Sequence, residues 1–324
     1  MKLALKPVLW SLVVFCTWQS VKGQSSLSKK QRPNIVYIMS DDHGYQAISA
    51  YGYRLNKTPN IDRLAKEGIL FTRATVTNSL CAPSRAVLLT GKHSFVNGKV
   101  DNEARFNWNQ DNFAKQLQQH GYQTALIGKI HMDGLPQGFD HSAVLIDQGE
   151  YYNPNFIVNG TKKQLQGYVT DLTTDMAIDW IKSRDKEKPF CLLYHQKAPH
   201  REWLPALRHL SAYTSMTVPE PKTLSDDYAN RGSAARTAEM NILKHMNWAG
   251  DNKIPPALMD ELGIKEYLNW DKAAFNNNLG RMTPAERASW DSVYNPIMAA
   301  FKKEYPSMND QELMRWRYQA LMEN

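Results

Sequence analysis

Cysteine is scarce in this sequence, with three in 324 residues. Cys16 lies in the apolar stretch at the N-terminus, which leaves Cys81 and Cys191 in the rest of the chain. These two could pair in an oxidising compartment, but one disulfide in a chain of this length is no disulfide framework. The class of small, disulfide-stapled proteins is therefore excluded.

A strong charge of one sign is also missing, because 39 lysines and arginines face 32 acidic residues. The basic residues are scattered, and no run of them is suited to following a phosphate backbone. We therefore expect no nucleic-acid partner. The sequence has no internal repeat or low-complexity tract, and its hydrophobic fraction of 42% is enough for a large buried core.

The N-terminus holds a short apolar run, residues 8–18, which follows Lys2 and Lys6 and precedes small residues near Gly23. This order is typical of a secretory signal, and the run is too short for a membrane-spanning helix. We predict a signal peptide over residues 1–23, export to the periplasm or the cell exterior, and no stable membrane span after its removal. An uncleaved N-terminal anchor is the alternative.

Apolar stretches alternate with amphipathic ones through residue 200. The apolar stretches predict buried strands over 34–40, 123–128 and 189–195. The amphipathic stretches predict helices over 58–68, 111–121 and 171–182. The first helix should bury Ile61, Leu64 and Ala65. This alternation favours an α/β fold with a largely parallel sheet that is covered on both faces.

The last third of the chain is less regular. Residues 201–282 are polar, rich in aromatic side chains and weakly patterned, so we expect long surface segments that shape a pocket. Thr283 and Glu286 form a capping box that predicts a helix over 283–305. Residues 309–324 have helical spacing, and the chain stops inside this expected helix.

Polar residues follow three of the predicted strands, at the point where each strand ends: Asp41 and Asp42, then Lys129 and His131, then Lys197 and His200. Any one pair could belong to a solvated loop. Their repetition is more informative, because parallel α/β sheets bind ligands at the carboxyl ends of their strands. The sequence therefore predicts a ligand site at this edge of the sheet.

The chemistry of these residues points to an anion and a hard cation. Asp41 and Asp42 are adjacent carboxylates, and oxygen ligands of this kind suit Ca²⁺ or Mg²⁺. Lys129 and His131 are two positions apart, so an extended backbone would point both to one side. A fixed positive charge and a titratable group would then face the same spot.

Cys81 begins an apolar helical stretch, "CAPSRAVLLTG". A thiol at a helix N-terminus should ionise easily, and Arg85, about one turn further on, can reach back over it. Together the two residues would form a nucleophile site that binds anions. The plain alternative is a buried, unreactive thiol beside an ordinary turn, and it requires several coincidences.

These residues carry a resemblance to a known family. "CAPSRAVLLTGK" resembles the sulfatase signature Cys-x-Pro-Ser-Arg followed by Thr-Gly. "PNIVYIMSDDHGY", "TPNIDRLAKEGILFTRA", "LIGKIH" and "KAPH" are similar to further sulfatase landmarks in the same order, from about residue 32 to the end. The resemblance implies an alkaline-phosphatase-like α/β/α sandwich. It is strongest to exported bacterial sulfatases of 6-O-sulfated N-acetylglucosamine in glycosaminoglycans.

The resemblance also implies roles for the candidate residues. Cys81 would be oxidised by a separate maturing enzyme to formylglycine, whose hydrate attacks sulfur and later expels sulfate. Asp41, Asp42 and the modified Cys81 would bind one Ca²⁺. Arg85 and Lys129 would neutralise negative charge, and His131 would handle the proton of the hydrate. His200 would protonate the leaving oxygen. Lys197 would be a further candidate for contact with the sulfate, and Lys92 would support the nucleophile turn.

Two features of the family have no counterpart in this sequence. We find neither the second pair of calcium ligands, an Asp-Asn segment with a later lysine, nor the smaller C-terminal domain. We therefore expect residues 24–324 to form a partial N-terminal catalytic domain, with the sheet incomplete at its C-terminal side and little activity by itself. Two carboxylates alone are too few for Ca²⁺, which takes about six to eight oxygens.

Two other functions stay open at this point. One is a phosphatase or phosphodiesterase of the same superfamily, which would need a Ser or Thr nucleophile and two metal ions. The other is an inactive protein that binds sulfated glycans through Arg85, Lys129 and Lys197 without turnover. The oxidation state of Cys81 distinguishes the second from an enzyme.

Overall fold

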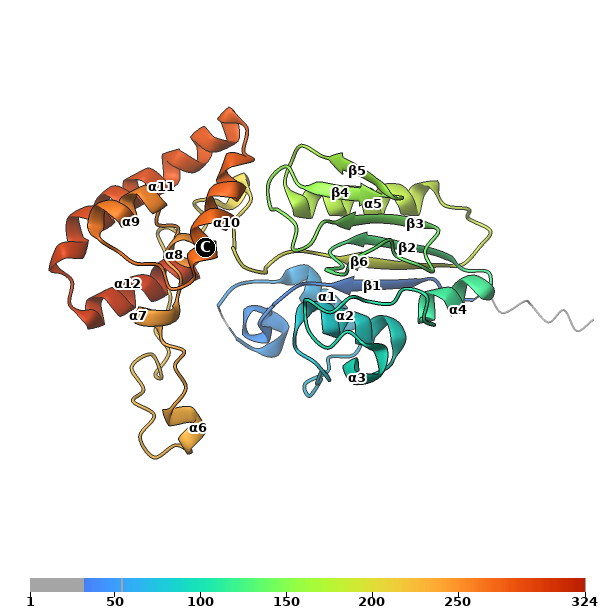
Figure 1. Ribbon diagram of the computed structural model, residues 1–324, viewed down its shortest axis with the longest axis horizontal. Coiled ribbons are helices and arrows are strands. Elements are labelled where there is room, and N and C mark those ends of the chain that lie inside the picture. The colour runs from blue at the N-terminus through green and yellow to red at the C-terminus, as the bar shows by residue number, and fades with distance from the viewer. Residues whose placement is uncertain (1–31, 54, 324) are drawn as a thin grey trace, which may run out of the picture. The chain divides into compact units, whose positions relative to one another are not determined.

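A computed structural model describes residues 32–53 and 55–323, and its contacts group Asn34–Asn324 into one compact unit. The centre is a six-stranded sheet in the order β1-β6-β2-β3-β4-β5 (Figure 1). The strands are β1 (Ile35–Met39), β2 (Gln123–Gly128), β3 (His141–Leu145), β4 (Asn155–Val158), β5 (Thr161–Gln164) and β6 (Phe190–His195). The first four in sheet order run parallel, and β4 and β5 add an antiparallel hairpin. The predicted α/β fold with a largely parallel sheet is confirmed.

The helices include every helix that the sequence pattern predicts. The α-helices are α1 (Pro59–Glu67), α2 (Cys81–Thr90), α3 (Ser94–Asn97), α4 (Phe113–Gln119), α5 (Val169–Ser183), α6 (Ser233–Arg236), α7 (Ile242–His245), α8 (Ala249–Asn252), α9 (Pro256–Leu262), α10 (Asn269–Gly280), α11 (Pro284–Glu304) and α12 (Asp310–Met322). Short 3-10 turns are η1 (Tyr45–Ala47), η2 (Ser49–Tyr51), η3 (Leu207–His209) and η4 (Tyr305–Ser307).

Alternate side chains of the central strands enter two different cores. Leu126 of β2 packs with Ala82 and Ala86 of α2 on one face of the sheet. Its neighbours Ala125 and Ile127 pack on the other face, in the core that contains Ala177 of α5. This alternation follows from the two-residue period of a strand. The expected covering of the sheet by helices on both faces is therefore present at its centre.

Strand β1 departs from the expectation of a buried strand. It pairs with β6 on one side only, and the exposed fractions of its side chains include 49% for Val36 and 57% for Ile38. The expected burial of Ile61 and Leu64 by helix α1 is also wrong, because both side chains are exposed, at 40% and 56%. A continuous apolar run predicts a strand, but only the sheet order decides whether that strand is central or at the edge.

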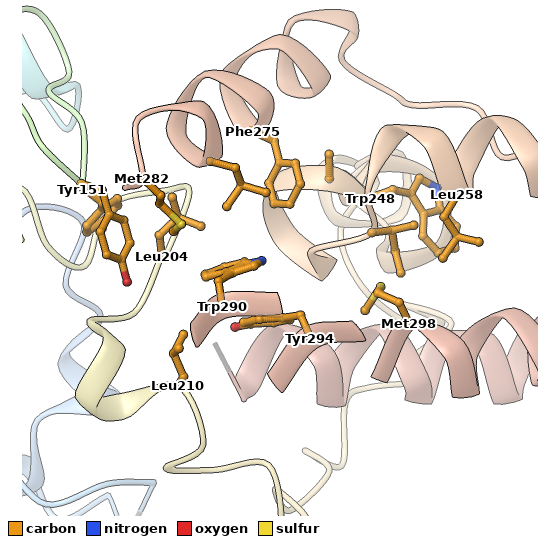
Figure 2. Packing of buried hydrophobic residues seen from close by; sticks show 14 of the residues in the cluster. Tyr151, Leu204, Leu210, Trp248, Leu258, Phe275, Met282, Trp290, Tyr294 and Met298 are labelled. Carbon is orange, nitrogen blue, oxygen red and sulfur yellow. The ribbon is translucent and has the colours of Figure 1, made fainter. Parts of the chain in front are cut away.

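Residues 201–282 are more than surface segments, which corrects the sequence-based expectation. Helices α8, α9 and α10 contribute Trp248, Leu258 and Phe275 to the largest buried cluster of the described chain. Trp290 and Tyr294 of α11 belong to the same cluster, with their rings stacked at 4.1 Å between centroids (Figure 2). Short helices with irregular connections have too few turns for a periodic hydrophobic pattern. The contribution of residues 201–282 to the core could therefore not be predicted from the sequence.

Helix α11 begins where the capping pattern predicts. The Thr283 hydroxyl accepts a hydrogen bond from the Glu286 backbone N–H, and the Glu286 carboxylate accepts one from the Thr283 N–H. This capping box satisfies two backbone donors that the first helical turn would otherwise leave unpaired. The helix then supplies Trp290, Tyr294 and Met298 to the core at helical spacing.

Cys81 and Cys191 are both free thiols, so the possible disulfide between them does not form in this structure. Cys191 is fully buried, as expected for a small apolar side chain in a core strand, and burial raises its pKa to about 11. Across the described ranges, no helix combines the length and apolar character that crossing a bilayer requires. The predicted signal peptide, residues 1–23, lies outside the described residues.

Gly128 ends strand β2 at a point where no side chain fits. Its φ is +107°, and a Cβ atom built on it would lie 1.7 Å from the carbonyl oxygen of His195 in β6. The next residue donates its backbone N–H to that same oxygen at 2.9 Å. This close approach of β2 to β6 fixes where Lys129 leaves the sheet.

Replacing Gly128 with alanine should therefore destabilise the fold far more than an ordinary glycine substitution. We expect a loss of at least about 3 kcal/mol in the free energy of unfolding, since backbone would have to move. Gly91→Ala is the matched control, because Gly91 also has positive φ, +65°, but open space around a new Cβ. It should cost only about 1 kcal/mol. Urea unfolding of both variants measures the difference, and equal losses would contradict the close approach.

The free edge of β1 should make the 324-residue chain self-associate, because an exposed apolar edge strand is a template for pairing with a second chain. Val36→Lys and Ile38→Lys together should shift the protein towards monomer. Leu135→Lys with Phe95→Lys adds the same two charges at other exposed apolar residues, 50% and 80% exposed, and should leave association unchanged. Analytical ultracentrifugation over a concentration series tests this. An unsubstituted chain that stays monomeric at every concentration would show that the β1 edge does not mediate self-association.

Candidate functional site

The carboxyl ends of β1, β6 and β2 lie side by side, as the sequence predicts. Backbone hydrogen bonds continue past the strands and join their loops: Asp41 N–H to Ala198 O at 3.2 Å, Gln196 N–H to Met39 O at 2.8 Å, and Lys129 N–H to His195 O at 2.9 Å. These bonds bring the three polar segments to one edge of the sheet. The first residue of α2, Cys81, reaches the same place.

Asp41 lies at the centre of this arrangement and is almost fully buried. Lys129 Nζ donates to one carboxylate oxygen, and Arg85 Nη2 lies 3.3 Å from the other. Burial by itself would raise the pKa of Asp41, but the charges of Lys129 and Arg85 outweigh it and lower the pKa. Asp41 is therefore a carboxylate that two cations keep ionised inside the protein.

Cys81 is the first residue of α2 and points its Sγ towards Asp41, with 3.8 Å between Sγ and Oδ1. The expectation of an easily ionised thiol is wrong in this structure. Burial raises the pKa of Cys81, and although Lys129 lowers it, Asp41 and Asp42 raise it further. Burial, the largest of these effects, thus keeps the thiol pKa raised despite the position of Cys81 at the helix start. Unmodified Cys81 is a poor nucleophile.

Two groups at the ends of β2 and β6 position the Arg85 guanidinium. Its Nη1 donates to the Lys129 carbonyl at 2.6 Å and lies 3.1 Å from His195 Nδ1. Its Nη2 is buried and makes no hydrogen bond, apart from the ion-pair contact with Asp41. Nη2 can therefore still donate hydrogen bonds to an anion that enters the site.

His195 was not singled out by the sequence analysis, although it is the single polar side chain that ends an apolar strand. It is fully buried, and burial together with the charge of Arg85 lowers its pKa to about 3. The ring is therefore neutral at physiological pH. It packs edge-on against Tyr37 at 5.9 Å between centroids and fixes the position of Arg85.

His200 has a defined proton arrangement. Its Nδ1 donates to the backbone carbonyl of Arg201 at 2.5 Å, so Nε2 is the atom that gains or loses a proton. Nε2 faces Asp42 Oδ2 at 3.5 Å. Burial lowers the pKa of His200, and the charge of Lys129 lowers it further.

Asp41, Cys81 and His200 form a group that could hold a metal ion, because each offers a ligand atom within 4.8 Å of the others. Asp42 was expected as a metal ligand too, and it lies beside this group through its contact with His200. Its backbone has φ +54°, an uncommon conformation for a residue with a side chain. Asp41 and the Cys81 thiol thus lie together, whereas Asp42 approaches the group only through His200.

Lys129 and Lys197 bring two further cations to the site. Lys129 is fully buried and also donates to Gln148 Oε1 at 2.5 Å, a partner that no sequence pattern revealed. Lys197 lies over the ring of Tyr151 at 4.7 Å and donates to the Arg201 carbonyl at 3.4 Å. Burial and the neighbouring charge of Lys129 lower its pKa to about 8.

His131 and Lys92 lie less centrally than the sequence suggested. His131 Nε2 pairs with Asp147 Oδ1 at 3.0 Å, and its buried Nδ1 makes no hydrogen bond. Its φ of +53° turns it away from the extended path expected after Lys129. Burial and the charge of Lys129 lower its pKa to about 4, so the ring is neutral and can accept a proton. Lys92 lies beyond the far end of α2 from Cys81, about 15 Å along the helix.

The neutral state of His195 leads to a prediction for stability against pH. In the unfolded chain a histidine binds its proton near pH 6.5, whereas buried His195 does so only near pH 3. The unfolded state therefore binds more protons in this window, and stability falls as the pH drops through it. His195→Gln should remove about 2 kcal/mol of the stability difference between pH 7 and pH 5. Urea unfolding at both pH values measures it, and an unchanged difference would show that His195 is protonated when folded.

Comparison with known proteins agrees with this geometry. The sequence model of the sulfatase family matches residues 33–253. The chain is 45% identical over 295 residues to an N-acetylglucosamine-6-O-sulfatase of Bacteroides thetaiotaomicron. This aligned region covers 90% of this chain and 51% of that protein. It is 26% identical to the human N-acetylglucosamine-6-sulfatase, over 64% of this chain and 42% of the relative. The chain thus spans about half the length of these relatives.

The chain is also similar to a solved structure of a sulfated-sugar complex. The structure of BT4656 in complex with its substrate D-glucosamine-2-N,6-O-disulfate superposes with a TM-score of 0.81 at 43% identity, over 90% of this chain and 58% of that one. The similarity includes all three polar segments, Cys81 and Arg85, since the family match runs from residue 33 to residue 253. The resemblance found in the sequence is confirmed, and this chain belongs to the sulfatase family.

Proposed function

We propose that this chain carries catalytic machinery of a sulfatase that removes the 6-O-sulfate from glucosamine units of a glycosaminoglycan. The observation that carries the proposal is the position of Cys81 at the start of α2, facing Asp41 among the cations Arg85 and Lys129. The sugar is suggested by the names of the relatives, which act on 6-O-sulfated N-acetylglucosamine or bind a 6-O-sulfated glucosamine. The same comparisons favour a sulfatase over a phosphatase or phosphodiesterase.

The raised pKa of Cys81 is consistent with a residue that acts only after modification. We propose that a separate maturing enzyme oxidises Cys81 to formylglycine. The hydrate of this aldehyde carries two hydroxyl groups on one carbon, so one can attack sulfur and the other can later expel sulfate. Asp41 lies close enough to the position of Sγ, at 3.8 Å, to influence either hydroxyl.

A calcium ion fits this site in part. Asp41 and Asp42 supply carboxylate oxygens of the type that Ca²⁺ prefers, and the oxygen of a modified Cys81 would add another. Bound there, the ion would polarise the sulfate group and favour the ionised hydrate. Ca²⁺ takes about six to eight oxygens, so these three residues fill less than its whole coordination shell.

The remaining residues have separate roles in the proposal. Arg85 offers its unused Nη2 to the sulfate, and Lys129 and Lys197 neutralise further negative charge. In its protonated form, His200 delivers the Nε2 proton to the sugar oxygen as it leaves, since the Nδ1 proton is tied to the Arg201 carbonyl. His131 is neutral and can take the proton of the hydrate.

A non-catalytic protein that binds sulfated glycans is the second candidate. It is favoured by one observation, the small number of oxygen ligands around Asp41 compared with the three cations nearby. Both candidates require the anion site, but only the enzyme requires the aldehyde. The mass of the peptide that contains Cys81 separates them, because the aldehyde side chain is lighter than the thiol.

Export and maturation complete the proposal. A chain with the predicted leader over residues 1–23 would reach the periplasm or the cell exterior, where polymeric glycans are met. The maturing enzyme would act on Cys81 before folding buries it, because the residue is only partly exposed in the folded chain. The proposed partners of this chain are therefore a maturing enzyme and a sulfated carbohydrate.

The first test is sulfate release from N-acetylglucosamine 6-sulfate by protein produced together with a formylglycine-generating enzyme, with Ca²⁺ present. Cys81→Ala should lower turnover by at least about a thousandfold, because it removes the nucleophile. Removal of Ca²⁺ with a chelator should have a similar effect. Ion chromatography of released sulfate gives the rate.

Cys191→Ala is the matched control, because Cys191 is fully buried in strand β6, within a hydrophobic core cluster. It should retain turnover even if the protein loses some stability. Residual turnover in Cys81→Ala close to that of the unsubstituted protein would refute the assignment of the nucleophile. Sulfated-sugar binding without sulfate release, together with an unmodified thiol at Cys81, would support the glycan-binding candidate.

A further inference from the structure

A pocket of about 460 Å³ opens beside the proposed reaction centre. Asp42 forms the wall on the side of that centre, and Arg201, Trp203, Asn241, Met246 and Asp251 line other parts. The volume lies within the range of pockets that hold a small ligand. Most of the lining is apolar, with polar groups at a few places, which is the usual composition of such pockets.

One wall is a rigid ion pair. The Arg201 guanidinium binds both carboxylate oxygens of Asp251, at 2.5 Å from Nη2 to Oδ2. Asp251 is almost fully buried and accepts the backbone N–H of Asn247 at 2.7 Å. Trp203 and Trp270 flank the guanidinium at 5.6 and 5.8 Å. The charges of Arg201 and Asp251 cancel, so this wall offers polar atoms without a net charge.

Trp203 supplies a flat apolar surface in the same pocket. Its backbone has φ +48°, a conformation that a bulky side chain rarely adopts. Such backbone positions persist only where the surroundings impose them, and they cluster at ligand sites. The surroundings of Trp203 thus hold its backbone in this conformation beside the pocket.

The pocket is joined directly to the proposed proton donor. Arg201 follows His200 in the chain, and its carbonyl accepts the His200 Nδ1 hydrogen bond at 2.5 Å. Asp42 both lines the pocket and contacts His200 Nε2 at 3.5 Å. A group that lies in this pocket therefore has its edge next to the atom that would protonate a leaving oxygen.

We propose that this pocket holds the pyranose ring that carries the sulfate, with the ring face on Trp203 and hydroxyls towards the Arg201–Asp251 pair. The inference rests on the proposed function and extends it to the sugar. A pyranose has apolar C–H faces and a rim of hydroxyls, which matches an indole beside neutralised polar groups. The sulfate then lies outside the pocket, among Arg85, Lys129 and Lys197.

The test compares two ligands on the 324-residue chain with Cys81 unmodified, which binds without turnover. N-acetylglucosamine 6-sulfate and inorganic sulfate are titrated by calorimetry in the presence of Ca²⁺. Trp203→Ala should weaken binding of the sugar sulfate by about tenfold, because it removes the stacking surface. Binding of inorganic sulfate should change by less than about twofold, since Trp203 packs beside Arg201 and not beside the proposed sulfate ligands Arg85, Lys129 and Lys197.

Trp270→Ala is the matched control. Trp270 also packs on the Arg201 guanidinium, but it is 52% exposed and does not line the pocket. It should leave both affinities unchanged. Met240→Trp covers the case in which Trp203→Ala fails to fold, because Met240 lines the pocket and is 90% exposed. A larger side chain there should obstruct the pocket and weaken only the sugar sulfate.

The outcomes separate this inference from the proposed function. Equal loss in Trp203→Ala and Trp270→Ala would overturn the pocket, because the effect would then run through Arg201. Unchanged sugar-sulfate affinity in both pocket variants would overturn it too. If the unsubstituted chain binds neither ligand, the anion site and the proposed function fail. Selective loss in the pocket variants, with inorganic sulfate still bound, would support the sugar site.

Discussion

The buried carboxylate of Asp41 is the interaction on which the rest of the site depends. A charge removed from water is costly unless cations and hydrogen bonds replace the lost hydration, and here Lys129 and Arg85 do so from two other elements. Loss of either cation would leave an uncompensated buried charge. The cluster therefore joins the end of β1, the end of β2 and helix α2, and it sets Cys81 at the start of that helix 3.8 Å from Asp41.

Strands β2 and β6 of the sheet also position Arg85. Gly128 lets β2 approach the backbone of His195 so closely that Lys129 and His195 share one stretch of backbone hydrogen bonding. His195 and the Lys129 carbonyl then hold Nη1 of Arg85, which leaves Nη2 with its ion pair to Asp41 and with donor capacity for an anion. A glycine, a neutral buried histidine and a backbone carbonyl thus act together as positioning groups. None of them needs to touch the substrate for the guanidinium to be aimed correctly.

Much of this could be predicted from the sequence, because strand ends and helix starts have local signals. The three polar segments, helix α2 and the capping box of α11 were all found in that way. The exposure of β1 was not, since it depends on sheet order. The raised pKa of Cys81 was not either, since it depends first on burial in the fold and then on carboxylates far away in the chain. His195 and Gln148 act only through partners that folding brings close. The core around Trp248 combines the predicted helix α11 with α8 and α9, which are too short to show a period.

Charge divides the site into two parts with different tasks. Around Cys81, the cations Arg85, Lys129 and Lys197 gather near Asp41, and Nη2 of Arg85 keeps donor capacity beyond its ion pair with that carboxylate. In the neighbouring pocket, Arg201 and Asp251 neutralise each other. An anionic group is therefore drawn to the first part and a neutral ring to the second. His200 lies at the boundary, with Nδ1 fixed by the pocket and Nε2 facing the reaction centre, where the bond between sulfate and sugar would lie.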